Sequence, residues 1–238
     1  MTKPYWQIEW ENKIETTLEN FKSKDDFKNY FNQEIVEGED PYFFQSPRGD
    51  GYPGEGISCL FSFLKQQTAK KSLEKLSIFL EAIVENILDE KIFHIAEKMD
   101  KTRPSGFTLY GITHKVPKNN SLAEKVLQKI RIKDIIKGKI EENSPNYLHQ
   151  QCLVGLYFDL LPTEKYDFEL IDKLGDNLPF ASVLFYSAIK ADKEKSKNLA
   201  KNYARYEINK KNKEMAQWIL KKYYPKDKDI AKFLRGLK

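Results

Sequence analysis

The sequence has few of the residues that build metal sites and disulfide frameworks. Its 238 residues include two cysteines, Cys59 and Cys152, and three isolated histidines, His94, His114 and His149. Both cysteines lie in apolar helical patterns, which is typical of free, buried thiols in a reducing compartment. The one suggestive spacing is His149-x-x-Cys152, and two ligands do not close a zinc site. We therefore predict a buried core pair there, with no metal and no cofactor.

Long hydrophobic runs are also missing. No uninterrupted apolar segment approaches the roughly 20 residues that a membrane-spanning helix needs. The N-terminal residues do not have the basic, apolar and small-residue regions of a secretory leader. From these absences we expect a cytoplasmic protein that has no contact with a membrane.

Motifs for nucleotide binding are absent or lack their context. No Gly-Lys-Ser or Gly-Lys-Thr occurs, so a lysine-bearing phosphate loop is excluded. Gly49, Gly51 and Gly54 match the letters of a dinucleotide fingerprint, but Pro53 lies inside the match and no strand pattern precedes it. The tripeptide Arg48-Gly49-Asp50 spells a cell-attachment signal, which would need an extracellular address. We interpret both matches as coincidence within a Gly/Pro-rich loop.

Apolar residues at helical spacing run through most of the chain and predict an all-α fold. Expected helices include one over 6–18, a second capped by Ser23 or Asp25, others over 56–68 and 72–87, and one that starts at a Ser121/Glu124 capping box and continues to Ile135. Beyond it, turns at 161–163, 191–192 and 224–226 separate helical hairpins. These hairpins fit either an irregular bundle or a short α-solenoid of stacked pairs.

Two segments interrupt the helical pattern. Residues 40–56 predict a long ordered loop, and residues 105–116 predict either a small β-hairpin or an ordered loop over the core. We expect one domain over 1–238. If it has two lobes, an acidic one over 1–100 and a basic one over 121–238 would meet near 101–120.

Charge is distributed unevenly along the chain. Residues 1–60 carry six basic and twelve acidic side chains, whereas residues 190–238 carry sixteen basic and six acidic ones. The whole chain, with the residues between them, has a net charge of +5. Such an asymmetry can steer partners of opposite sign toward each end. The alternative is that the charges only solvate exposed faces.

The basic end offers one regular feature. Lys193, Lys197, Lys201 and Arg205 recur at four-residue steps, where like charges on a helix repel each other, and Lys210 and Lys211 extend them. Tyrosines and Trp218 lie among these cations, so a nucleic-acid surface is one hypothesis. Against it, Leu199, Tyr203 and Tyr206, and likewise Met215, Ile219 and Tyr223, follow core-facing spacing.

Catalytic constellations are not recognisable in the sequence. Adjacent carboxylates occur, but nothing local forces the raised pKa that a general acid needs. We predict a protein that is not an enzyme, and keep an enzyme on a helical scaffold without a known motif as an alternative. The first prediction is a protein-binding module, of the kind found among bacterial immunity proteins, antitoxins and inhibitors, whose acidic surface and loop bind a basic protein. Its predicted contacts are Glu34, Glu37, Glu39, Asp40, Arg48, Asp50 and Glu55.

Overall fold

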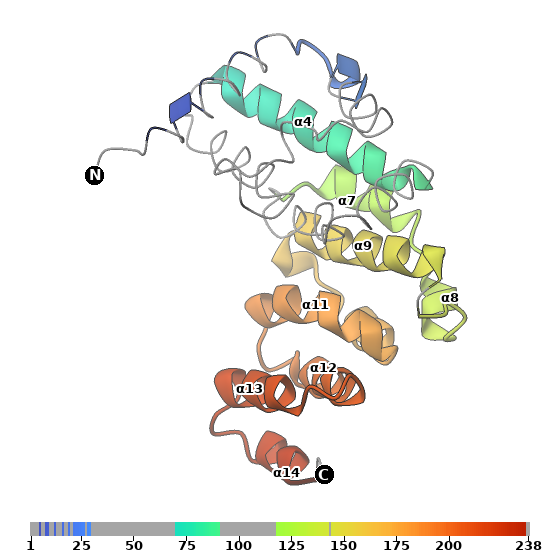
Figure 1. Ribbon diagram of the computed structural model, residues 1–238, viewed down its shortest axis with the longest axis vertical. Coiled ribbons are helices and arrows are strands. Elements are labelled where there is room, and N and C mark those ends of the chain that lie inside the picture. Colours follow the sequence, from blue (N-terminus) through green and yellow to red (C-terminus); the bar gives the residue numbers. More distant parts are fainter. Residues whose placement is uncertain are drawn as a thin grey trace. The chain divides into compact units, whose positions relative to one another are not determined.

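A computed structural model describes residues 70–90, 118–142 and 144–236, together with positions 5, 8, 9, 12, 16, 19, 21–26, 28 and 29. In this part of the chain 76% of residues are helical and none lies in a strand, which confirms the all-α prediction for it. The chain divides into two compact units, residues 1–126 and 127–238 (Figure 1). The predicted loop at 40–56 and the segment 105–116 lie outside the described residues.

In the N-terminal unit the longest described helix is α4, Lys70–Leu88. Leu80, Val84 and Ile87 are at most 1% exposed and recur at the spacing of one helix face, as predicted. On its partly exposed side, Glu85 pairs with Lys24 at 2.7 Å and with Lys28 at 3.2 Å. These two ion pairs connect α4 to the short helical stretch that follows residue 23.

Side-chain caps start two helices of this unit. Ser23 Oγ accepts a hydrogen bond from Asp26 N at 3.2 Å, and Asp26 Oδ2 accepts one from Ser23 N at 2.8 Å, so Ser23 is the predicted cap. Helix α7, Asn120–Leu127, is different. Its cap is Asn119, whose Oδ1 accepts from Leu122 N at 3.1 Å, and the predicted Ser121/Glu124 box is wrong because Ser121 already lies inside the helix.

The C-terminal unit consists of short helices joined by tight turns. They are α8 Ile132–Ile136, α9 Pro145–Leu160, the 3₁₀ turn η2 Thr163–Lys165, α10 Phe168–Gly175, α11 Leu178–Ala191, α12 Lys197–Asn209, α13 Lys213–Tyr223 and α14 Lys228–Gly236. Three helices of the unit end at the turns predicted from sequence, at Leu161, Asp192 and Tyr224. The single helix predicted from 122 to 135 is instead α7 and α8. The buried Gln150 side chain bonds the backbone of Lys129 and Arg131 between them.

In this unit each helix packs against helices one or two places away in chain order. Helix α11 packs against α9, α10 and α12; α12 packs against α13, and α13 against α14 (Figure 1). Phe158, Phe180 and Phe185 are the largest fully buried side chains. Phe185 contacts the rings of Tyr203 and Tyr223 with centroids 5.3 Å apart, so aromatic contacts join α11 to α12 and α13. Within the described residues, no helix has both the length and the apolar character to cross a membrane.

Candidate binding surface on the C-terminal helices

The predicted row of basic residues is divided by the fold into separate environments. Lys193 precedes α12, so it is not on the helix where the four-residue spacing placed it. Lys197, Lys201 and Arg205 lie on α12, whereas Lys210 and Lys211 lie in the turn after it. What each cation can bind depends on the carboxylates that the other helices bring to it.

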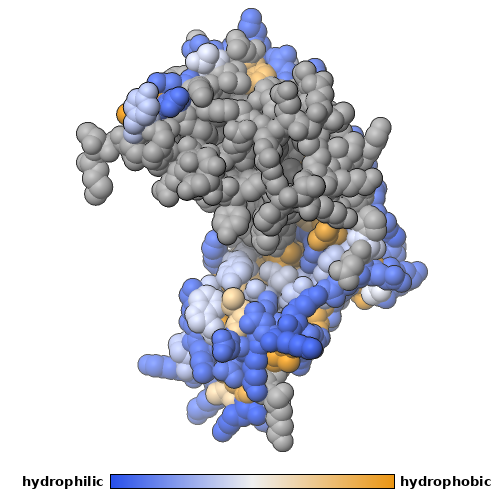
Figure 2. Space-filling view, in the orientation of Figure 1, coloured by the Kyte–Doolittle hydropathy of each residue, from blue (hydrophilic) through white to orange (hydrophobic). Residues whose placement is uncertain are grey.

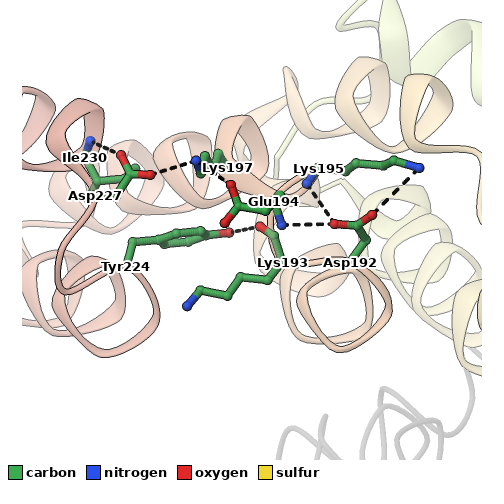
Figure 3. Close-up of polar contacts among 8 residues, drawn as sticks. All are labelled: Asp192, Lys193, Glu194, Lys195, Lys197, Tyr224, Asp227 and Ile230. Carbon is green, nitrogen blue, oxygen red and sulfur yellow. Dashed lines mark hydrogen bonds and ion pairs between the residues drawn. The ribbon is translucent and has the colours of Figure 1, made fainter.

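Lys197 is neutralised within the fold. Its Nζ lies 2.7 Å from Asp227 Oδ2 and 2.6 Å from Glu194 Oε2 (Figure 3). Hydrogen bonding to Asp227, and then to Glu194, raises the pKa of Lys197 above its ordinary value. The same contact, with the Ile230 N–H as second cause, lowers the pKa of Asp227. Lys197 therefore joins the start of α12 to the turn before α14.

The turn before α12 is fixed by neighbouring contacts. Asp192 Oδ1 accepts hydrogen bonds from the backbone N–H groups of Glu194 and Lys195 (Figure 3). Tyr224 Oη donates to the Lys193 carbonyl at 2.6 Å, and Lys193 Nζ lies 5.5 Å from the centre of the Tyr224 ring. The contacts between Lys193 and Tyr224 thus connect this turn to the end of α13. Lys193 is not part of the predicted basic face.

Lys201 and Arg205 line a groove between α12 and α14. The groove has a volume of about 510 Å³, and its remaining lining comes from Asp229, Lys232, Phe233 and Gly236. Within the part of the chain that the structure describes, the lining thus has three cations and one carboxylate. Among the described residues, neither Lys201 nor Lys232 makes an ion pair. The groove is the part of the predicted basic surface whose charge remains available.

Arg205 is held in place from both sides. Its Nη1 donates to Asn202 Oδ1 at 2.7 Å, and Asn202 Nδ2 donates to Asp176 Oδ1 at 3.1 Å. Asn202 is 5% exposed, so this support is nearly buried. On the α14 side, the guanidinium carbon lies 5.2 Å from the centre of the Phe233 ring, within the range of a cation–π contact. The charged head of Arg205 is exposed and oriented at the same time.

Lys210 is paired, like Lys197. Its Nζ lies 2.5 Å from Glu142 Oε1 and 5.5 Å from the Tyr206 ring centre, and the hydrogen bond to Glu142 raises its pKa. These residues line a hollow of about 670 Å³ that also borders the start of α11. Lys211 is exposed and has a left-handed backbone, with φ at 63°, in the turn between α12 and α13. Neither residue shares the α12–α14 groove.

Helix α13 presents apolar side chains to solvent. Trp218 is 46% exposed and Met215 37% exposed, so the prediction that Met215 faces the core is wrong, although Ile219 is buried. Lys222 Nζ lies 4.4 Å from the Trp218 ring centre. On the face drawn in Figure 2 the coloured surface of the C-terminal helices is mostly hydrophilic, with a few separate apolar patches. Exposed Trp and Met side chains, and the aliphatic part of a Lys side chain, can adapt to the surface of a binding partner.

Several polar groups lie in the core of the unit. Cys152 is 2% and His149 5% exposed, as predicted for a core pair. Burial raises the pKa of the Cys152 thiol to about 12, with the negative charge of Asp159 as second cause, so the thiol is neutral at neutral pH. Ser187 Oγ donates to Asp159 Oδ1 at 2.7 Å between α11 and α9. In the described part of the chain no three His, Cys, Asp or Glu side chains form a group that could hold a metal.

The predicted acidic contacts are on a different part of the chain. Glu34, Glu37, Glu39, Asp40, Arg48, Asp50 and Glu55 lie outside the described residues, so they stay predictions. Asn202, Lys232 and Phe233 were not among the predicted site residues. A signal for Lys232 exists in the sequence, because Lys228, Lys232 and Arg235 recur on one helix face. No sequence signal identified Asn202, whose position depends on its contacts.

None of the family models, curated proteins or solved structures with which the chain was compared matches it.

Proposed function

We propose that the chain is a non-enzymatic binding module whose partner is another protein. The supporting observation is that α9 to α14 bury apolar side chains against other helices of the unit, while α10, α12, α13 and α14 carry exposed charged residues. In this proposal the helices act as a short α-solenoid of stacked pairs, an architecture that offers an extended surface to partners. The exposed Trp218 and Met215 are residue types enriched in protein interfaces.

A bacterial immunity protein, antitoxin or inhibitor is the kind of binding module that we propose. The partner would be a basic protein, bound by the acidic residues between Glu34 and Glu55. The support for this part is the excess of acidic side chains in residues 1–60. An acidic surface attracts a basic partner over a distance and accelerates its association, most strongly at low salt.

Native mass spectrometry of the full chain purified from its own cells tests the protein-partner proposal. We expect a heterocomplex whose added mass is a protein. Reversal of Glu37, Glu39 and Asp40 to lysine should slow association with that partner at low salt. The matched control reverses three exposed acidic residues elsewhere, Glu164, Glu169 and Glu214. Equal slowing in both variants would contradict an acidic contact surface between residues 34 and 55.

Nucleic-acid binding through the basic C-terminal helices is a second candidate. The observation that favours it is the groove of Lys201, Arg205 and Lys232, in which Asp229 is the one carboxylate that the described lining residues supply. Binding should weaken steeply with salt, because each neutralised phosphate releases counterions. A gel-shift titration with single-stranded and duplex probes at low and physiological salt tests it. No retarded species at micromolar protein would contradict this candidate.

A further inference from the structure

We propose that the groove between α12 and α14 is a phosphate-binding site, with Arg205 as its central ligand-binding group and the backbone of a nucleic acid as its ligand. This inference deepens the second candidate function and rests on it. It assigns the binding to one groove and to one oriented guanidinium, instead of to the general positive charge of the C-terminal helices.

The first step concerns which cations are available. Lys197 and Lys210 already bind carboxylates of the same chain at 2.5–2.7 Å, so a ligand would have to displace Asp227, Glu194 or Glu142 to reach them. Lys201, Arg205 and Lys232 have no such competitor among the described residues apart from Asp229 at the groove. The site therefore contains fewer of the basic residues than the sequence pattern predicted.

The second step concerns the orientation of Arg205. A guanidinium has five N–H donors in a fixed plane, and one of them donates to Asn202. The contact with Phe233 supports its face, and the nearly buried Asn202 is itself held by Asp176. An arginine that is ordered before binding loses less conformational entropy when it binds an anion. This support distinguishes Arg205 from an ordinary exposed cation.

The third step concerns the shape of the ligand. Lys201 and Arg205 are one helical turn apart on α12, and Lys232 approaches from α14, so the cations line both sides of an open groove. Lys228 and Arg235 lie on α14 at the neighbouring turns. Repeated charge along two walls suits a polymer that carries one negative charge per unit, as a nucleic-acid strand does. Arginine also recognises phosphate oxygens with paired, planar hydrogen bonds.

The test measures the binding of the full-length protein to a labelled single strand, a duplex of the same length and labelled polyglutamate by fluorescence anisotropy. Arg205→Lys keeps the charge but loses the planar fork, and we expect it to lower nucleic-acid affinity about tenfold. Arg205→Gln and Lys232→Gln should in addition reduce the salt slope by about 0.7–0.9 each. Lys221→Gln, on exposed α13 surface, removes the same charge outside the groove and should change affinity less than twofold, in the range of about 0.4 kcal/mol.

Asn202→Ala tests whether Asn202 positions the arginine. We expect lower affinity with an unchanged salt slope, because the number of cations stays the same. Since Asn202 is nearly buried, thermal unfolding of each variant is measured alongside, and the exposed Arg205 variants carry the test if Asn202→Ala does not fold.

Three results would overturn the inference, and they differ from one another. If the wild type binds nucleic acid while the Arg205 variants behave like Lys221→Gln, the groove is not the site but the nucleic-acid candidate stands. If the wild type binds no nucleic acid, the nucleic-acid candidate and the phosphate site in the groove are both wrong. If polyglutamate binds as tightly and loses affinity in Arg205→Gln, the groove takes carboxylates of an acidic protein and the phosphate assignment is wrong.

Discussion

At the residue scale, the contacts of Asp227 combine two roles. Its Oδ2 pairs with Lys197 at 2.7 Å, and its Oδ1 accepts from Ile230 N at 3.0 Å, which caps α14. Both contacts favour the charged carboxylate and lower its pKa. A carboxyl group whose pKa is lower in the folded state stabilises the fold above its unfolded pKa, and this contribution is lost as the pH falls through the folded pKa.

Asp227→Asn should therefore lower the thermal unfolding midpoint at pH 7. The amide can still accept the Ile230 hydrogen bond, so the loss reports the ion pair with Lys197. The difference from wild type should shrink below about pH 4, where the unfolded carboxyl group protonates. The measurement is a set of melting curves by circular dichroism between pH 3 and 7.

Asp229→Asn is the matched control, because Asp229 lies in the first turn of the same helix and makes no ion pair among the described residues. Equal losses in Asp227→Asn and Asp229→Asn at pH 7 would mean that the charge of α14, and not the pair with Lys197, carries the effect.

At the element scale, the approach of α10 to α12 depends on Gly175. A Cβ atom at this position would lie 2.4 Å from Leu199 Cδ1, and Leu199 is fully buried. Alanine is otherwise favoured over glycine in a helix by up to about 1 kcal/mol. A loss of stability in Gly175→Ala would therefore come from steric overlap between the two helices.

We expect Gly175→Ala to lower the free energy of unfolding by about 1–3 kcal/mol in a urea titration. Gly236→Ala is the control, because nothing lies within 4 Å of its added Cβ. Leu199→Ala should be destabilising alone, by about 2–5 kcal/mol. In the double variant the total loss of stability should be smaller than the sum of the two single losses, because the Leu199 methyl group that overlaps the added Cβ is absent. Additive costs would contradict a direct contact.

The helix boundaries show which features of the secondary structure could be predicted from the sequence. The ends of α9, α11 and α13 were predicted from Pro162, Asp192 and Pro225. These residue types favour the end of a helix through their effect on the local backbone. The division into α7 and α8 was not predicted, because Ile130 and Ile135 are both buried and continue an apolar pattern. The break is stabilised by Gln150, a residue 19 positions after Arg131. A window of sequence around residue 130 does not contain that partner.

At the scale of the whole molecule, the C-terminal unit has its own core. Every packed helix pair described for α8 to α14 lies within residues 127–238, and so do Phe158, Phe180 and Phe185. The unit carries 23 basic and 15 acidic side chains, so its separate expression also isolates the basic part of the chain.

A fragment of residues 127–238 should fold without the rest of the chain. We expect helical circular dichroism and a cooperative thermal transition. Phe185→Ala in the fragment should cost about 3–5 kcal/mol and abolish or greatly lower the transition, whereas Trp218→Ala, at an exposed aromatic, should change it little. A fragment that melts without a transition would contradict an independent core.

The amino-acid sequence by itself determined the helical class, the buried pair His149 and Cys152, the ends of the main C-terminal helices and most of their core faces. These features follow from hydrophobic periodicity and from local backbone preferences, both of which depend on residues within a few helical turns of each other in the sequence. Tertiary structure alone decided which cations remain available. Lys197 pairs with Asp227, 30 residues away, and Lys210, in the turn after α12, pairs with Glu142, 68 residues away. Lys201, one turn after Lys197 on α12, has no ion-pair partner among the described residues. Identical side chains at regular spacing acquire different electrostatics because an ion pair depends on which helix packs next to them, and spacing along one helix does not contain that information.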